Sequence, residues 1–126
     1  MKIAIISDTH GSITAFNRAM EVAGPCDFIV HAGDILYHGP RNPLPEGYKP
    51  QELANAINAL EVPFVAAAGN CDAPIDQVLL SVPIQAPYAM LYIENFKILV
   101  NHGHDASLEE LIELCRKWKV NLLVTG

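Results

Sequence analysis

Short apolar runs alternate with amphipathic segments in the first third of the chain. The run Ile3–Ile6 has four apolar residues in a row, which is typical of a strand buried on both faces of a sheet. Apolar residues then recur at helical spacing over Ile13–Ala23, with Ser12 as the expected N-cap and Gly24–Pro25 as the stop. A second apolar run, Phe28–Val30, follows. Strand, helix and strand at this spacing predict a right-handed βαβ unit with parallel strands.

The same alternation continues to the end of the sequence. A helix is expected to begin at Pro50, which suits a first helical turn, and another after Ser107, which forms a capping-box pattern with Glu110. The apolar face of the helix expected after Ser107 includes Trp118, which we assign to the core. A single helical turn is expected within residues 74–80. Further strands are expected at Val62–Ala68, Tyr88–Glu94, Phe96–Val100 and Val120–Val124, with a tight hairpin at Asn95.

A long stretch from Tyr37 to Pro50 lacks any helix or strand pattern. Its four prolines and two glycines exclude regular structure. Loops of this length inside compact domains are usually functional or mobile. We interpret the segment as a wall or lid over a substrate, and an ordinary surface loop is the alternative.

Composition and charge narrow the class of protein. A chain of 126 residues with 51% hydrophobic residues is expected to form one α/β domain, residues 1–126. The net charge of -6 argues against a nucleic-acid or membrane-surface partner, although a bound metal would still allow a small phosphorylated substrate. Three cysteines without CxxC spacing indicate a reducing compartment, and we expect a cytoplasmic protein with no signal peptide or membrane span.

Polar residues of the metal-binding type follow four of the apolar runs. They are Asp8 and His10, Asp34, Asn70, and His102. Because the carboxyl ends of parallel strands meet at one edge of a sheet, these side chains are expected to converge. Carboxylate, amide and imidazole donors suit Mn, Fe, Zn and similar ions. A carboxylate such as Asp34 can bridge two ions, the arrangement used in phosphoester hydrolysis.

Simpler explanations exist for each residue taken alone. A single Asp at a strand end is often a helix N-cap, and Asn70 could be a turn residue. His38 and Arg41 could contact phosphate or belong to a solvated loop, and His104 could be an exposed loop residue. His31 lies within a strand and is expected to be packed or hydrogen-bonded rather than a ligand.

Four short motifs, in order, each follow a strand: D-x-H at 8–10, G-D at 33–34, G-N-C-D at 69–72 and H-G-H at 102–104. With them the sequence resembles the calcineurin-like metallophosphoesterase superfamily along essentially its whole length. The segment after Asp34 is similar to YfcE-type bacterial phosphodiesterases. The resemblance implies an αββα sandwich of two mixed sheets flanked by helices. It also implies that the sequence lacks the C-terminal strands, since the G-H-x-H motif of the family would begin at Gly126.

The resemblance further implies a site with two divalent ions, with Mn as the first choice and Zn, Fe, Ni or Mg as alternatives. The first ion would be bound by Asp8, His10 and Asp34, and the second by Asp34, Asn70 and His102. Asp34, Asn70 and His102 would also be the catalytic residues. Substrate contacts would come from His38, Arg41, Cys71 and His104. Cys71 stands where many relatives have a histidine that protonates the leaving group.

The expected activity is therefore metal-dependent hydrolysis of a small phosphodiester by a metal-bound hydroxide. The alternative is a catalytically impaired fragment or a non-catalytic interaction scaffold, a role that this fold has in the retromer complex. Sheet edges left exposed by missing strands would favour a homo-oligomer.

Overall fold

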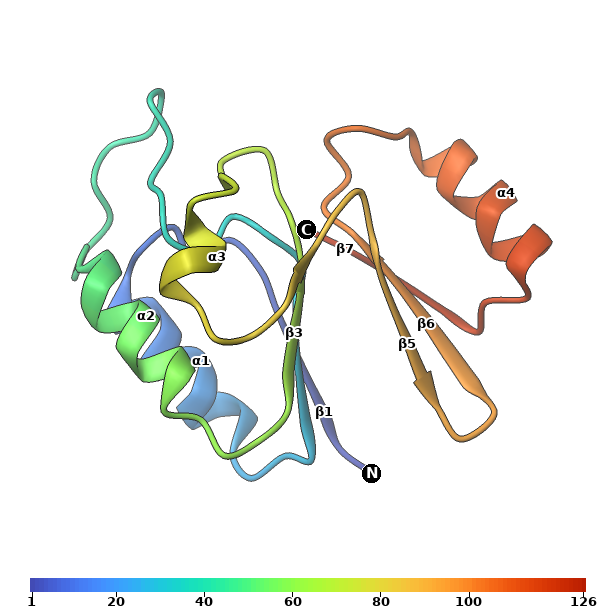
Figure 1. Ribbon diagram of the computed structural model, residues 1–126, viewed down its shortest axis with the longest axis horizontal. Coiled ribbons are helices and arrows are strands. Elements are labelled where there is room, and N and C mark those ends of the chain that lie inside the picture. Colours follow the sequence, from blue (N-terminus) through green and yellow to red (C-terminus); the bar gives the residue numbers. More distant parts are fainter.

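Two β-sheets lie face to face, and helices cover their outer sides (Figure 1). The computed structural model describes every residue from Met1 to Gly126. The first sheet contains β1 (Ile3–Ile6), β2 (Phe28–His31), β3 (Phe64–Ala67) and β4 (Ile84–Gln85) in that order, all parallel. The second contains β5 (Ala89–Ile93), β6 (Phe96–Asn101) and β7 (Leu122–Thr125), with β5 antiparallel and β7 parallel to β6. The expected αββα sandwich is confirmed, but only the second sheet is mixed.

Local sequence signals set the ends of the helices. The helices are α1 (Ile13–Ala23), α2 (Pro50–Asn58), α3 (Asp76–Leu79) and α4 (Leu108–Trp118). The Ser12 side chain accepts a hydrogen bond from the backbone N–H of Ala15, which caps α1. Ser107 and Glu110 form the capping box that the sequence predicts for α4. In Figure 1, α1, α2 and α3 lie beside the first sheet and α4 lies beyond the second.

Two separate hydrophobic cores result from the alternation of side chains along the strands. In β2, Ile29 belongs to the core under α1 and α2, whereas Val30 belongs to the core between the sheets. In β3, Phe64 and Val65 divide in the same way. Both faces of the central strands are therefore buried, which explains why their sequences are continuously apolar.

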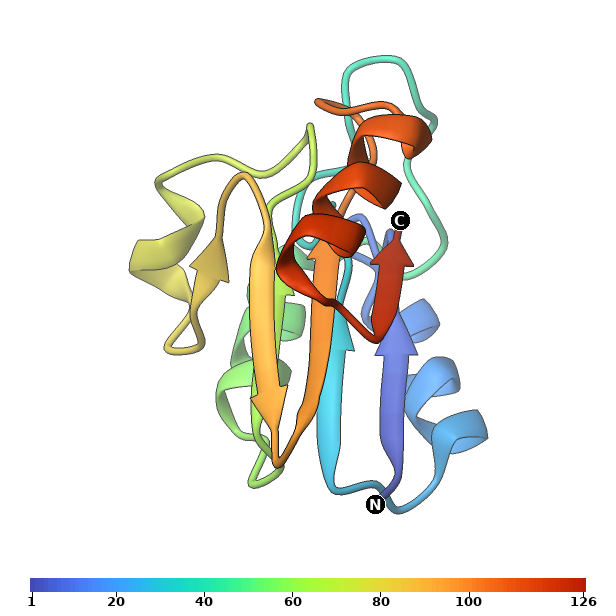
Figure 2. The same ribbon diagram turned by 90° about the vertical axis from the view of Figure 1, so that its right-hand side faces the viewer.

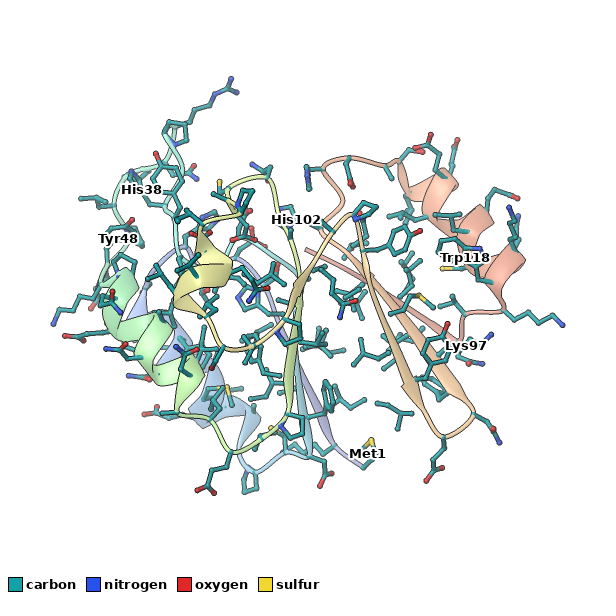
Figure 3. The ribbon with its side chains drawn as sticks, in the orientation of Figure 1. Met1, His38, Tyr48, Lys97, His102 and Trp118 are labelled. Atoms are coloured by element: carbon teal, nitrogen blue, oxygen red, sulfur yellow. The ribbon has the colours of Figure 1, made fainter.

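The apolar face that the sequence predicts for α4 is only partly buried. Leu111 is the one fully buried residue of α4. Trp118 is partly exposed and packs edge-on against Tyr88, with the ring centroids 5.1 Å apart, near Lys97 (Figure 3). Its assignment to the core was wrong, because the residue lies at the end of α4, where it lines a hollow on the outer side of the second sheet.

The carboxyl ends of all strands except the antiparallel β5 lie at one end of the molecule. Figure 2 shows the arrowheads of β1, β2, β6 and β7 all pointing to this end. The loop from Tyr37 to Lys49 leaves from the same end and contains no helix or strand, only an isolated bridge between Ser12 and Tyr48. None of the four helices is long and apolar enough to cross a membrane.

Candidate metal centre

Four side chains from the loops after β1, β2 and β6 meet at this end of the sandwich. The Nε2 atom of His10 lies 3.4 Å from Oδ1 of Asp8 and 3.6 Å from Oδ2 of Asp34. The Nε2 atom of His102 lies 4.0 Å from the same Asp8 oxygen and 3.3 Å from the same Asp34 oxygen. Residues separated by almost a hundred positions thus share one cluster, with the labelled His102 lying centrally in Figure 3.

Asp34 lies at the centre of the cluster. Its side chain is only 4% exposed. Its Oδ1 atom accepts a hydrogen bond from the backbone N–H of Cys71 at 2.8 Å, so that Oδ2 is the oxygen facing both histidines. Two groups of potential ligands share this carboxylate: Asp8, Asp34 and His102 form one, and His10, Asp34 and Cys71 form the other. A carboxylate between two such groups has the position needed to bridge two ions.

Both histidines are oriented by backbone carbonyl groups. The Nδ1 atom of His10 is 2.8 Å from the carbonyl oxygen of Tyr37, and that of His102 is 2.8 Å from the carbonyl oxygen of Ala32. Each Nδ1–H therefore donates to a carbonyl, and each Nε2 keeps its lone pair toward the carboxylates. This is the usual arrangement of histidines that bind metals, so the donor set fits a divalent ion.

The backbone at three of these residues lies in the left-handed region. The φ angles are 57° at Asp8, 45° at His10 and 60° at Asp34. Non-glycine residues in such conformations cost of order 1–3 kcal/mol each and concentrate at functional sites. Three of the candidate ligands therefore have a backbone conformation that is typical of functional sites.

Two glycines allow the loops to approach each other. Gly33 has a φ angle of 109°, and a Cβ atom there would lie 2.6 Å from the Gly69 nitrogen and 2.8 Å from Nδ1 of His102. A Cβ atom at Gly69 would collide with the carboxylate of Asp34. Both positions require glycine because a larger residue would displace two candidate ligands.

Asp72 fixes the backbone around Asp34. Its carboxylate accepts hydrogen bonds from the backbone N–H groups of Asp34 at 2.7 Å, Ile35 at 2.8 Å and Gly69 at 2.7 Å. The last residue of the G-N-C-D motif therefore joins the loops after β2 and β3. Its carboxylate is occupied by these bonds and orients its neighbours.

A buried pair that the sequence did not reveal joins the loops after β1 and β2. His31 is fully buried, and its Nδ1 atom accepts a hydrogen bond from the Gly33 N–H at 3.1 Å. Its Nε2–H faces the Thr9 hydroxyl at 3.0 Å, and that hydroxyl donates to the Ile35 carbonyl at 2.9 Å. Burial lowers the pKa of His31 to about 4, so the ring is neutral. The interpretation of His31 as a packed, hydrogen-bonded residue is confirmed.

The candidate metal ligand Asn70 and the candidate substrate residues are spread around the cluster. Arg41, Asn70 and Cys71 line a hollow of about 700 Å³ beside it. Asn70 is exposed, and its side-chain amide is 3.6 Å from the sulfur of Cys71. His104 is exposed, with its ring 5.5 Å from that of His102.

His38 lies apart from these residues, within the loop. Its ring packs edge-on against Tyr37 and Tyr48, at centroid distances of 4.8 Å and 5.2 Å (Figure 3). Its Nδ1 atom is buried without a hydrogen-bond partner. The structure therefore places His38 between two tyrosines rather than with the candidate ligands.

Comparison with known proteins agrees with this geometry. Residues 1–126 match the calcineurin-like phosphoesterase superfamily domain. The chain belongs to this superfamily. Among its members, phosphodiesterase YfcE of Escherichia coli (strain K12) is 42% identical over 106 residues, which cover 82% of this chain and 58% of that protein. The chain thus spans less than two thirds of the length of this curated relative.

Two solved structures share the fold. The structure of YfcE, a phosphoesterase from E. coli, superposes with a TM-score of 0.77 at 38% identity, covering 87% of this chain and 62% of that one. Wild-type Vps29 complexed with Zn²⁺, from Entamoeba histolytica, has a TM-score of 0.57 at 20% identity, covering all of this chain and 63% of that one. At this identity the second comparison shows the fold alone.

Proposed function

We propose that this chain binds two divalent metal ions at its strand ends and hydrolyses a small phosphodiester there. The observation that carries the proposal is the position of Asp34, a buried carboxylate that faces His10 on one side and His102 on the other. The similarity to a relative named phosphodiesterase YfcE supports the type of reaction. The three free cysteines are consistent with a reducing, cytoplasmic location.

The proposed ligands follow the motifs of the superfamily. Asp8, His10 and Asp34 bind one ion, and Asp34, Asn70 and His102 bind the other, with Mn²⁺ as the first choice. Ions held there would lower the pKa of a bound water and neutralise phosphate oxygens. The chain's own contribution is to hold both histidines by their Nδ1 atoms, and to hold Asp34 through Cys71 and Asp72.

Residues beside the cluster would position the substrate. Arg41 lines the hollow, and its guanidinium group can bind a phosphate oxygen pair. Burial, followed by the nearby carboxylates of Asp34, Asp72 and Asp8, raises the pKa of the Cys71 thiol. In the metal-free protein Cys71 is therefore protonated at neutral pH and is not a nucleophile. The two remaining proposed substrate residues are His104, whose ring lies next to that of His102, and His38, which belongs to the loop that lines the hollow.

Hydrolysis of bis(p-nitrophenyl) phosphate tests the proposal. We expect turnover that requires Mn²⁺, stops on addition of EDTA and is lost in Asp34→Asn, which keeps the size of the side chain but removes its charge. Turnover by Asp34→Asn equal to that of the unmodified chain would refute the mechanism. Catalysis is favoured over the scaffold hypothesis because a scaffold has no chemical need for the ordered donor set.

A further inference from the structure

One of the two ligand groups contains a sulfur atom. The donor atoms of His10, Asp34 and Cys71 all lie within 4.8 Å of one another. They come from the loops after β1, β2 and β3. The other group, Asp8, Asp34 and His102, has only oxygen and nitrogen donors. The two ligand groups that share Asp34 therefore differ in that only one of them offers a sulfur donor.

The sulfur of Cys71 is held in place by its own backbone and by the neighbouring loop. The Cys71 N–H donates to Oδ1 of Asp34 at 2.8 Å, which keeps the residue beside the shared carboxylate. Gly39 lies close to the sulfur, because a Cβ atom there would lie 3.1 Å from it. The thiol is thus positioned next to Asp34 before any ligand binds.

The same loop directs His10 toward this group. The Tyr37 carbonyl accepts from Nδ1 of His10 at 2.8 Å, so that Nε2 faces Asp34. Tyr37 and Gly39 therefore place the imidazole and the sulfur on the same side of the carboxylate. Two of the three donors are oriented by contacts outside the ligand set, as in preorganised metal sites.

We propose that the ion held by His10 and Asp34 is a thiophilic divalent ion, Zn²⁺ or Co²⁺, with Cys71 as a thiolate ligand. The inference rests on the metal centre of the proposed function and adds a distinct preference to one half of it. On binding, the S–H bond breaks, a sulfur–metal bond forms and the proton passes to solvent. Thiolate donors favour Zn²⁺ and Co²⁺ over Mn²⁺ and Mg²⁺, whereas the ion proposed at Asp34, Asn70 and His102 would meet only oxygen and nitrogen donors.

Cobalt spectroscopy of the full chain tests the sulfur ligand directly. The double variant Cys26→Ser/Cys115→Ser keeps Cys71 as the only thiol, and both altered positions lie outside the two ligand groups. Addition of Co²⁺ to this variant should produce the near-ultraviolet charge-transfer absorption of a cobalt–thiolate bond. The further change Cys71→Ser should abolish that absorption.

Binding and protection measurements complete the test. We expect Cys71→Ser to weaken Zn²⁺ binding by at least about tenfold. Loss of a residue that only hydrogen-bonds to a metal ligand already lowers metal affinity by about this factor. In the double variant, whose Cys71 is unaltered, Zn²⁺ should slow alkylation of the thiol, while Mn²⁺ should slow it less.

Two results would overturn this inference and separate it from the proposed function. Co²⁺ binding without charge-transfer absorption, together with unimpeded alkylation in Zn²⁺, would exclude the sulfur ligand and leave the proposed phosphodiesterase intact. Failure of Co²⁺, Zn²⁺ and Mn²⁺ to bind at all would overturn both.

Discussion

Polar side chains hold the loops that present the candidate ligands. Asp72 accepts three backbone N–H groups from the loops after β2 and β3. His31 and Thr9 connect the loops after β1 and β2. The loops after β1, β2 and β3 are therefore fixed by side chains that are not themselves proposed ligands, and changes at these positions should alter the stability of the site.

The neutral state of His31 predicts a pH dependence of stability. The pKa of His31 is about 4 in the folded chain, whereas an unfolded chain has the ordinary histidine value of 6.5. Between these two pH values the unfolded chain therefore binds more protons than the folded chain. The contribution of neutral His31 to the free energy of unfolding is complete above pH 6.5 and decreases by roughly 3 kcal/mol as the pH falls toward 4. We expect His31→Gln to lack this pH-dependent part of the free energy of unfolding, because glutamine does not titrate. Urea unfolding of both proteins at about pH 7 and about pH 4.5 measures the difference. Parallel losses of stability would contradict the prediction.

The principal residues of the centre could be predicted because each follows an apolar run. Asp8, His10, Asp34 and His102 stand at strand ends, and parallel strands bring their ends together. The supporting contacts could not be predicted in this way. The Thr9–His31 pair and the carbonyl of Tyr37 act across loops, and no local pattern encodes such contacts.

At the scale of elements, the helix caps are the clearest link between sequence and structure. The capping box of α4 satisfies two backbone donors, one at Ser107 and one at Glu110. We expect Ser107→Ala to lower the free energy of unfolding by about 1 kcal/mol. Ser107→Thr keeps a hydroxyl acceptor and should retain most of that stability. Equal losses in the two variants, measured by urea unfolding, would show that the cap is not responsible.

Periodicity predicted the long elements, but it could not predict how far each is covered. The strand β4 has only two residues, Ile84 and Gln85, and forms because β3 offers a free edge. Trp118 has the helical spacing of a core residue, yet it lies at the end of α4 and lines a hollow with Tyr88 and Lys97. Burial at these positions depends on neighbouring elements and not on the local pattern.

At the scale of the whole molecule, β1 presents an unpaired edge. It lies at the end of the first sheet, and Figure 2 shows β7 at the same side of the molecule. Ile5 in β1 is 48% exposed and lines a largely apolar hollow of about 530 Å³ between β1 and α1. Exposed apolar edges favour pairing with another chain.

We therefore predict that the protein self-associates through this edge as its concentration rises. Ile5→Lys should lower the association constant, because a charged residue on an edge strand opposes pairing. Leu44→Lys is a matched control, since Leu44 is 64% exposed in the loop. Light scattering over a range of concentrations gives the result. A single monomeric species throughout would refute the prediction.

The number of metal ions bound per chain tests the central claim most directly. Calorimetric titration with Co²⁺, which accepts oxygen, nitrogen and sulfur donors, should give two ions per chain. Asp34→Asn should weaken both binding events, because the two ligand groups share this carboxylate. A single ion per chain, or two ions whose affinities are unchanged in Asp34→Asn, would show that Asp34 does not bridge a dinuclear centre.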